Sequence, residues 1–122
     1  MNAKQVFLNE TRLVDAISDL DLPVVVDGFI SSTAALLAAL IAPSSARLFF
    51  FATRSGAAGH AFALQHLQDL AEASGLPRPP GASLDMRLRL GEGTGGVLAA
   101  PVLRAAAAAL RGMASLADFL SD

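Results

Sequence analysis

Apolar residues near the N-terminus repeat at helical spacing. The positions that carry the repeat are Leu13, Val14, Ile17 and Leu20. Separations of three and four residues predict a helix within residues 5–20. Asp21 and Pro23 end that helix, because proline has no amide proton with which to continue it.

Two short apolar runs have the length and composition of strands. Residues 24–26 are three valines, and residues 48–51 are a leucine followed by three phenylalanines. Both runs are continuous rather than alternating, which predicts strands that are buried on both faces. Between them we expect a helix over residues 34–41, capped by a hydroxyl side chain of residues 31–33 and stopped by Pro43.

The second half of the chain predicts more helix. Residues 60–73 place four apolar side chains on an inward face, namely Phe62, Leu64, Leu67 and Leu70. Residues 84–90 alternate between apolar and charged positions, which predicts an extended, half-exposed segment. An alanine-rich helix then runs to about Met113 and is kinked by the internal Pro101. A last short helix carries Leu116, Phe119 and Leu120.

This order of elements implies an α/β fold. Strands that alternate with helices pair in parallel through right-handed crossovers, and the helices cover the faces of the sheet. A chain of 122 residues has the length of one such domain, so residues 1–122 are expected to form a single unit. In open parallel sheets, ligands bind beyond the carboxyl ends of the strands. The polar residues that follow the two runs are therefore expected to lie close together.

Composition and charge narrow the range of partners. The chain is 53% hydrophobic, which excludes disorder and leaves an apolar face exposed unless a partner covers it. Lys and Arg number 9 against 11 Asp and Glu, so we expect no nucleic-acid partner. The chain has no cysteine, which excludes a disulfide framework and a thiolate zinc site. Its histidines lack metal-ligand spacing, and no cofactor is expected.

Residues 28–46 are uncharged and have the length of a membrane span. They contain several hydroxyl side chains and Pro43, and their apolar centre covers only residues 34–42. We therefore expect a buried helix and no membrane contact. The polar first twelve residues differ from a signal peptide, and a cytoplasmic location is expected.

Asp27 follows the valine run directly. A carboxylate at this place binds a ribose hydroxyl or orients a catalytic loop. Alternatively, it caps the turn of residues 31–33 or faces solvent. The sequence leaves both interpretations open.

The loop before the helix of residues 60–73 offers a guanidinium, hydroxyls and a flexible backbone, on Arg54, Ser55 and Gly56. A helix N-terminus attracts phosphate, although ordinary loops have the same composition. His60 begins the helix, where the helix dipole lowers the pKa of an imidazole, and a structural role is preferred to a ligand role. His66 is expected on the helix surface.

Four glycines surround Glu92 in residues 91–96. Glycines permit positive φ angles and close approach of the backbone. Backbone donors before a helix attract an anion, but Glu92 repels a phosphate on the loop. A buried glutamate has a raised pKa and serves as a general base for an N–H or O–H proton. The alternative is a flexible turn with an exposed glutamate.

Three segments together resemble a known enzyme family. They are Val-Val-Val-Asp-Gly-Phe-Ile-Ser at 24–31, Arg-Ser with Gly-His within 54–60, and Leu-Arg-Leu-Gly-Glu-Gly-Thr-Gly at 88–95, followed by the helix with Pro101. In this order they resemble the C-terminal part of the nicotinate-nucleotide–dimethylbenzimidazole phosphoribosyltransferases. The resemblance covers roughly residues 13–119.

The resemblance implies a Rossmann-like parallel sheet of few strands, flanked by Ala/Leu-rich helices, and a dimer. It implies transfer of ribose phosphate from nicotinate mononucleotide to a benzimidazole nitrogen, in the synthesis of the lower ligand of cobalamin. Glu92 would be the general base, Leu90 and Gly91 would line the base pocket, and the loop of residues 54–59 would lie near the nucleotide. The implied substrate-binding set is Asp27, Arg54, Ser55, Gly56, Leu90, Gly91, Gly93 and Thr94.

The chain departs from the family in two ways. It matches only the last part of much longer enzymes, and the upstream elements of the nucleotide site have no counterpart. The family's Ser-Ala-Glu-Pro-Gly-His loop reads Ser-Gly-Ala-Ala-Gly-His at residues 55–60. Three hypotheses follow: an enzyme subunit completed by a second chain that carries the missing part, a non-catalytic module that binds a nucleotide, an aromatic base or a protein and forms a homo-oligomer, or a fragment of a longer or degenerate product.

Overall fold

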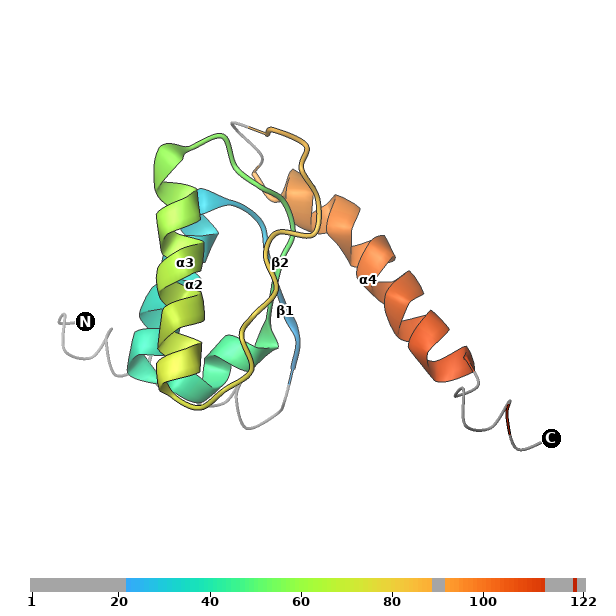
Figure 1. Cartoon of the computed structure of the whole chain (residues 1–122). Coiled ribbons are helices and arrows are strands. Elements are labelled where there is room, and N and C mark those ends of the chain that lie inside the picture. Colours follow the sequence, from blue (N-terminus) through green and yellow to red (C-terminus); the bar gives the residue numbers. More distant parts are fainter. Residues whose placement is uncertain (1–21, 89–91, 114–119, 121–122) are drawn as a thin grey trace, which may run out of the picture.

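The computed structural model describes residues 22–88, 92–113 and 120. Their elements, in chain order, are strand β1 (Val24–Val26), helix α2 (Phe29–Ile41), 3₁₀ helix η1 (Pro43–Leu48), strand β2 (Phe49–Phe51), helix α3 (Ala58–Ala73) and helix α4 (Thr94–Gly112). In Figure 1, α2 and α3 lie side by side against the two strands, and α4 extends away from them. The helices expected within residues 5–20 and 114–119 lie outside the described residues.

The sheet is small and parallel, as the alternation of helices and strands predicts. Val24 pairs with Phe49 and Val26 with Phe51. Beyond β2 the ladder continues as an isolated parallel bridge between Thr53 and Leu84. The segment of residues 84–90 was expected to be extended; in its described part it contributes this bridge and forms no strand.

Helix α2 begins five residues before the predicted start. Its N-cap is Gly28, and the amide of Gly28 donates to Ser31 Oγ over 2.9 Å. The hydroxyl predicted to cap the helix therefore lies inside its first turn. Thr33 Oγ1 likewise donates back to the carbonyl of Phe29 at 3.0 Å. The predicted stop is confirmed, because α2 ends at Ile41 and Pro43 opens η1.

Helix α3 matches the predicted helix, but the prediction that Phe62 points inward is wrong. Leu67 is fully buried and Phe62 is 69% exposed. The buried residues of α3 recur every three or four positions, at His60, Ala63, Leu67 and Ala71. One residue step turns an α-helix by about 100°, so Phe62 points away from this face.

The core lies between the sheet and the pair α2 and α3. It joins Val26 and Phe51 of the strands to the inward faces of the helices. Its helical members are small or aliphatic: Ala35, Ala39, Leu67 and Ala71. Alanines on both helices allow α2 and α3 to approach closely.

Helix α4 is the predicted alanine-rich helix and contains Pro101. Its buried residues are Gly95 and Ala99, both near its N-terminus. The rest of its length carries exposed apolar side chains, among them Val97, Val102 and Leu110. In the described part of the chain, no helix has the combination of length and apolar character needed to cross a membrane.

Candidate functional site

The carboxyl end of β1 holds the start of α4. Asp27 follows β1, and its Oδ2 accepts a hydrogen bond from the amide of Gly93 at 3.1 Å. Its Oδ1 accepts one from the amide of Gly96 at 2.9 Å. Asp27 therefore caps α4, and the expectation that it caps the turn of residues 31–33 is wrong. The other interpretation is that this carboxylate binds a ribose hydroxyl or orients a catalytic loop. The observed contacts agree with its second part, since they hold the loop that carries Glu92.

Glu92 stands directly before this cap with its backbone in the left-handed region. Its φ angle is +43°, and Gly93 follows with φ +90°. Non-glycine residues adopt this conformation rarely. Glu92 is exposed, so of the two interpretations of this loop the exposed glutamate agrees with the structure and the buried carboxylate does not. The anion that the donors of the glycine-rich loop attract is Asp27 of the same chain.

The first turn of α4 leaves no room for a side chain at Gly95. A Cβ at this position would lie 2.5 Å from Thr53 Cγ2 and 2.6 Å from Asp27 Oδ1. The first turn of α4 therefore packs directly on the residues that follow β1 and β2. Close backbone approach, predicted from the glycine run, is confirmed here.

Glu92 lies at the rim of a groove of ≈ 600 Å³. The start of α2, the residues after β2 and the loop before α4 form its walls. Its lining includes Asp27, Phe29, Ser55, Leu88, Glu92 and Gly93. We call this space the Glu92 groove. Phe29 and Leu88 give it apolar surface next to the carboxylates.

His60 is a structural histidine, as predicted. It is 2% exposed, and its Nδ1 accepts a hydrogen bond from the amide of Ser55 at 2.9 Å. Since Nδ1 is an acceptor, the neutral ring carries its proton on Nε2, which lies 3.0 Å from Ser32 Oγ. Burial lowers the pKa of His60, and the nearby Arg54 guanidinium lowers it further. His66, in contrast, is exposed on α3, as expected.

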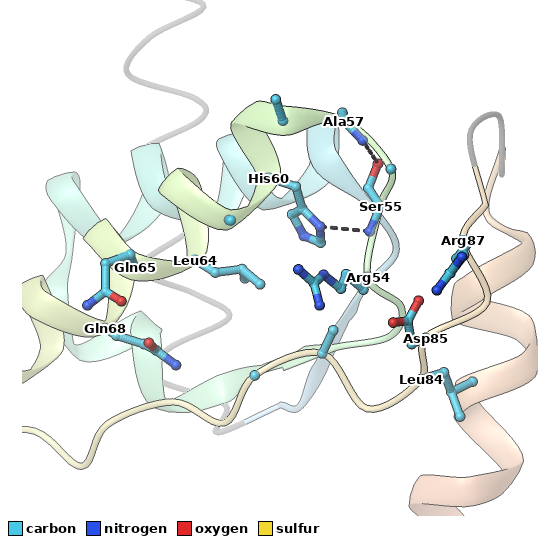
Figure 2. Close-up of a pocket in the computed structure, with 15 residues that line it drawn as sticks. Arg54, Ser55, Ala57, His60, Leu64, Gln65, Gln68, Leu84, Asp85 and Arg87 are labelled. Carbon is cyan, nitrogen blue, oxygen red and sulfur yellow. Dashed lines mark hydrogen bonds between the residues drawn. The ribbon is translucent and has the colours of Figure 1, made fainter.

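A second cavity of ≈ 870 Å³ shares Ser55 and Ala57 of the loop after β2 with the Glu92 groove. Figure 2 shows Arg54 beside the His60 ring, with Asp85 and Arg87 on the neighbouring segment. We call this space the Arg54 cavity. Arg87 is a basic residue of this cavity that the sequence reasoning missed. Its backbone is left-handed, with φ +51°, and the alternating pattern of residues 84–90 gives no signal for that conformation.

The predicted site residues thus divide between two spaces. Asp27, Glu92 and Gly93 line the Glu92 groove. Arg54 and Gly56 line the Arg54 cavity, and Ser55 borders both.

The remaining predicted site residues have other positions. Thr94 is exposed at the first position of α4 and lines neither space. Leu90 and Gly91 lie outside the described residues. Within residues 22–88, 92–113 and 120, no group of three His, Cys, Asp or Glu side chains is placed to hold a metal ion.

This chain resembles known phosphoribosyltransferases of one kind. A family model described as phosphoribosyltransferase matches residues 14–119. The chain is 46% identical over 101 residues to the nicotinate-nucleotide–dimethylbenzimidazole phosphoribosyltransferase of Shewanella amazonensis, covering 83% of this chain and 26% of the relative. It is 48% identical over 96 residues to the enzyme of that name from Vibrio atlanticus, covering 79% of this chain and 25% of the relative.

A third relative gives the same result. The Chloroflexus aurantiacus protein of that name is 43% identical over 96 residues, covering 79% of this chain and 24% of the relative. The chain therefore spans about a quarter of the length of these curated relatives. No solved structure matches the chain.

Proposed function

Because the chain belongs to this phosphoribosyltransferase family, we propose that it supplies the general base of a ribose-phosphate transfer site. The relatives named above carry nicotinate nucleotide and dimethylbenzimidazole in their names. We extend these substrates to this chain, together with a place in the synthesis of the lower ligand of cobalamin. The observation that supports the proposal is Glu92, held at the rim of the Glu92 groove by the capped start of α4.

The proposed reaction is a substitution at the anomeric carbon of ribose. A benzimidazole nitrogen attacks that carbon, the bond between the carbon and the nicotinate nitrogen breaks, and nicotinate leaves with the bonding electron pair. Glu92 accepts the proton from the attacking azole, which restores a neutral ring. The apolar side chains of Phe29 and Leu88 suit a flat heterocycle beside the carboxylate.

We propose that the Arg54 cavity receives the nucleotide side of the reaction. Arg54 and Arg87 bring two guanidinium groups to its lining, and guanidinium groups bind phosphate in a bidentate geometry. Ser55 borders both spaces, so a nucleotide there would lie next to the base groove.

We also propose that the site is completed by the part of the longer relatives that lies outside the stretch matched by this chain. Along its length, α4 exposes apolar side chains that water solvates poorly, namely Val97, Leu98, Val102 and Leu110, and the exposed Met113 follows its last residue. That part of the relatives would cover this face, extend the parallel sheet toward a Rossmann-like one and shield Glu92 from bulk water. A second copy of this chain is the alternative partner that could cover the same face of α4.

The test is nicotinate release from nicotinate mononucleotide and dimethylbenzimidazole, with this chain mixed with the remaining portion of a relative. We expect Glu92→Gln to lower kcat by roughly 10²- to 10⁴-fold, the usual contribution of a general base. Glu72→Gln is the matched control, since Glu72 is an exposed glutamate on α3 outside both spaces. Equal turnover in wild type and Glu92→Gln would contradict the proposal.

The exposure of Glu92 favours one alternative, a non-catalytic module that binds an aromatic base or a nucleotide. Calorimetry with each substrate separates the two. Binding that is unchanged by Glu92→Gln, together with no turnover in the completed mixture, supports the module.

A further inference from the structure

The cap on α4 comes from a side chain far away in the sequence. Asp27 is separated from Gly93 by 66 positions and from Gly96 by 69. Each carboxylate oxygen accepts one of these two amides. From this geometry we propose that Asp27 is a positioning residue, which fixes the backbone of residues 92–96 and thereby holds Glu92 at its groove. The proposal rests on the proposed function of Glu92, and it replaces the direct substrate contact that the sequence implied for Asp27.

The physical reason is that the first amides of a helix have no partner within the helix. A capping side chain normally supplies the acceptor locally, at the N-cap position. Here the N-cap is Gly93, which has no side chain. The carboxylate of Asp27 takes over that task from the end of β1, and its negative charge is favourable at the positive end of the helix.

The cap acts directly beside the proposed base. Glu92 precedes Gly93, the first residue that Asp27 binds. The backbone of Glu92 is left-handed, with φ +43°, a conformation that a glutamate leaves readily once the surrounding contacts are lost. Releasing the amide of Gly93 therefore frees the backbone rotation that sets the direction of the Glu92 side chain.

The close packing of Gly95 is a second contact that fixes where the first turn of α4 lies. Thr53, which follows β2, and Asp27, which follows β1, both lie within 3 Å of a Cβ built on Gly95. The turn therefore sits against the ends of both strands. A carboxylate held on one side and a close fit on the other define the position of Glu92 relative to the sheet.

The two roles of Asp27 make different kinetic predictions. A residue that binds ribose raises KM for nicotinate mononucleotide when it is changed. A residue that only orients Glu92 lowers kcat and leaves that KM nearly unchanged, because the misplaced base affects the chemical step.

The decisive experiment is amide hydrogen exchange, measured by NMR on the whole 122-residue chain. In Asp27→Asn one carboxylate oxygen becomes an NH₂ group, which cannot accept an amide proton. We expect exchange at Gly93 and Gly96 to accelerate about five- to tenfold, the usual effect of losing a cap. Asp69→Asn is the matched control, because Asp69 is an exposed carboxylate on α3. Protection of the Leu67 amide reports that each variant is folded.

Asp27→Glu provides a second variant if Asp27→Asn does not fold, because it keeps the charge and displaces the oxygens. Unchanged exchange at Gly93 and Gly96 in the folded variant overturns the proposal. In the completed mixture we expect kcat to fall at least tenfold in Asp27→Asn, with KM for nicotinate mononucleotide within about twofold of wild type. A raised KM with unchanged kcat also overturns it. If the wild-type mixture shows no turnover, the proposed function fails, whereas the exchange result still decides the role of Asp27 in holding the loop.

Discussion

Helices α3 and α4 have similar lengths and opposite surroundings. Helix α3 has 16 residues and buries one in each turn, from His60 to Ala71. Helix α4 has 19 residues and buries Gly95 and Ala99 only. In Figure 1 the first packs along the body and the second leaves it.

The difference shows two ways of fixing a helix. Helix α3 is held by apolar burial along its whole length, so its position is set by many weak contacts. Helix α4 is held at one end, by the Asp27 carboxylate and the close fit of Gly95. Much of its remaining apolar surface is exposed, as at Val97 and Leu110, and this is the face for which we propose a partner.

Truncating a leucine on each helix gives the largest expected contrast. Leu67→Ala leaves a cavity in the core, because Leu67 is fully buried, and we expect unfolding to become easier by about 2–5 kcal/mol. Leu110 is 80% exposed on α4, so Leu110→Ala should change the free energy of unfolding by less than about 0.5 kcal/mol. Urea denaturation measures both. A large loss in Leu110→Ala would show that α4 is packed in solution.

The two histidines of α3 test whether burial alone decides the stability of that helix. His60→Ala removes the acceptor of the Ser55 amide and the partner of Ser32, so we expect a loss of about 2–3 kcal/mol. His66→Ala changes an exposed ring and should stay within about 0.5 kcal/mol. Thermal unfolding of both variants provides the measurement, and equal losses would refute the structural role of His60.

Neighbouring glycines in the first turn of α4 test the close fit. Gly95→Ala places a methyl group against Thr53 and Asp27, and we expect a loss of about 1–3 kcal/mol. In Gly96→Ala the new methyl group lies 3.8 Å from Val25, an ordinary contact. That variant should be neutral or up to about 1 kcal/mol more stable, because alanine favours helix. If both variants are equally stable, the fit at Gly95 does not anchor α4.

The smallest expected effect is a pH dependence of the free energy of unfolding, which comes from His60 on the packed helix α3. The pKa of His60 is lowered in the folded chain, whereas in the unfolded chain it takes the ordinary value of about 6.5. As the pH falls below about 6.5, the unfolded state binds the proton first and gains stability. The contribution of His60 is therefore complete above this pH and is lost as the pH falls through the lower, folded pKa. Urea unfolding between about pH 7.5 and 5 should show a decline that persists in His66→Ala and shrinks in His60→Ala.

Much of this fold can be predicted from local patterns. The two strands, the stop at Pro43 and the length of α3 follow from apolar runs and from proline. The start of α2 was missed because Ser31 bonds to Gly28 from inside the helix, an arrangement that composition does not distinguish from an ordinary cap. Phe62 was misplaced because α3 packs through alanines, which carry little hydrophobic signal.

The site is predictable only in part, for a different reason. The glycines around Glu92 predict a close approach of the backbone. The residue that binds the amides of Gly93 and Gly96, however, is Asp27, which lies more than sixty positions away in the sequence. The exposure of Glu92 depends on which other parts of the structure surround its loop, and the local sequence pattern does not predict those surroundings. The division of the predicted residues between two spaces likewise depends on how the loop after β2 bends around His60.

The capping contact also has a consequence for sequence variation. Asp27 is the sole side chain in it, since its partners are the main-chain amides of residues 93 and 96, and every amino acid except proline has such an amide. Any residue other than proline at position 96 therefore keeps the amide that this contact uses, while position 27 requires an acceptor of the same reach. The hydrogen-bonded cap therefore depends on the side chain at position 27 alone, whereas the close fit constrains position 95 separately.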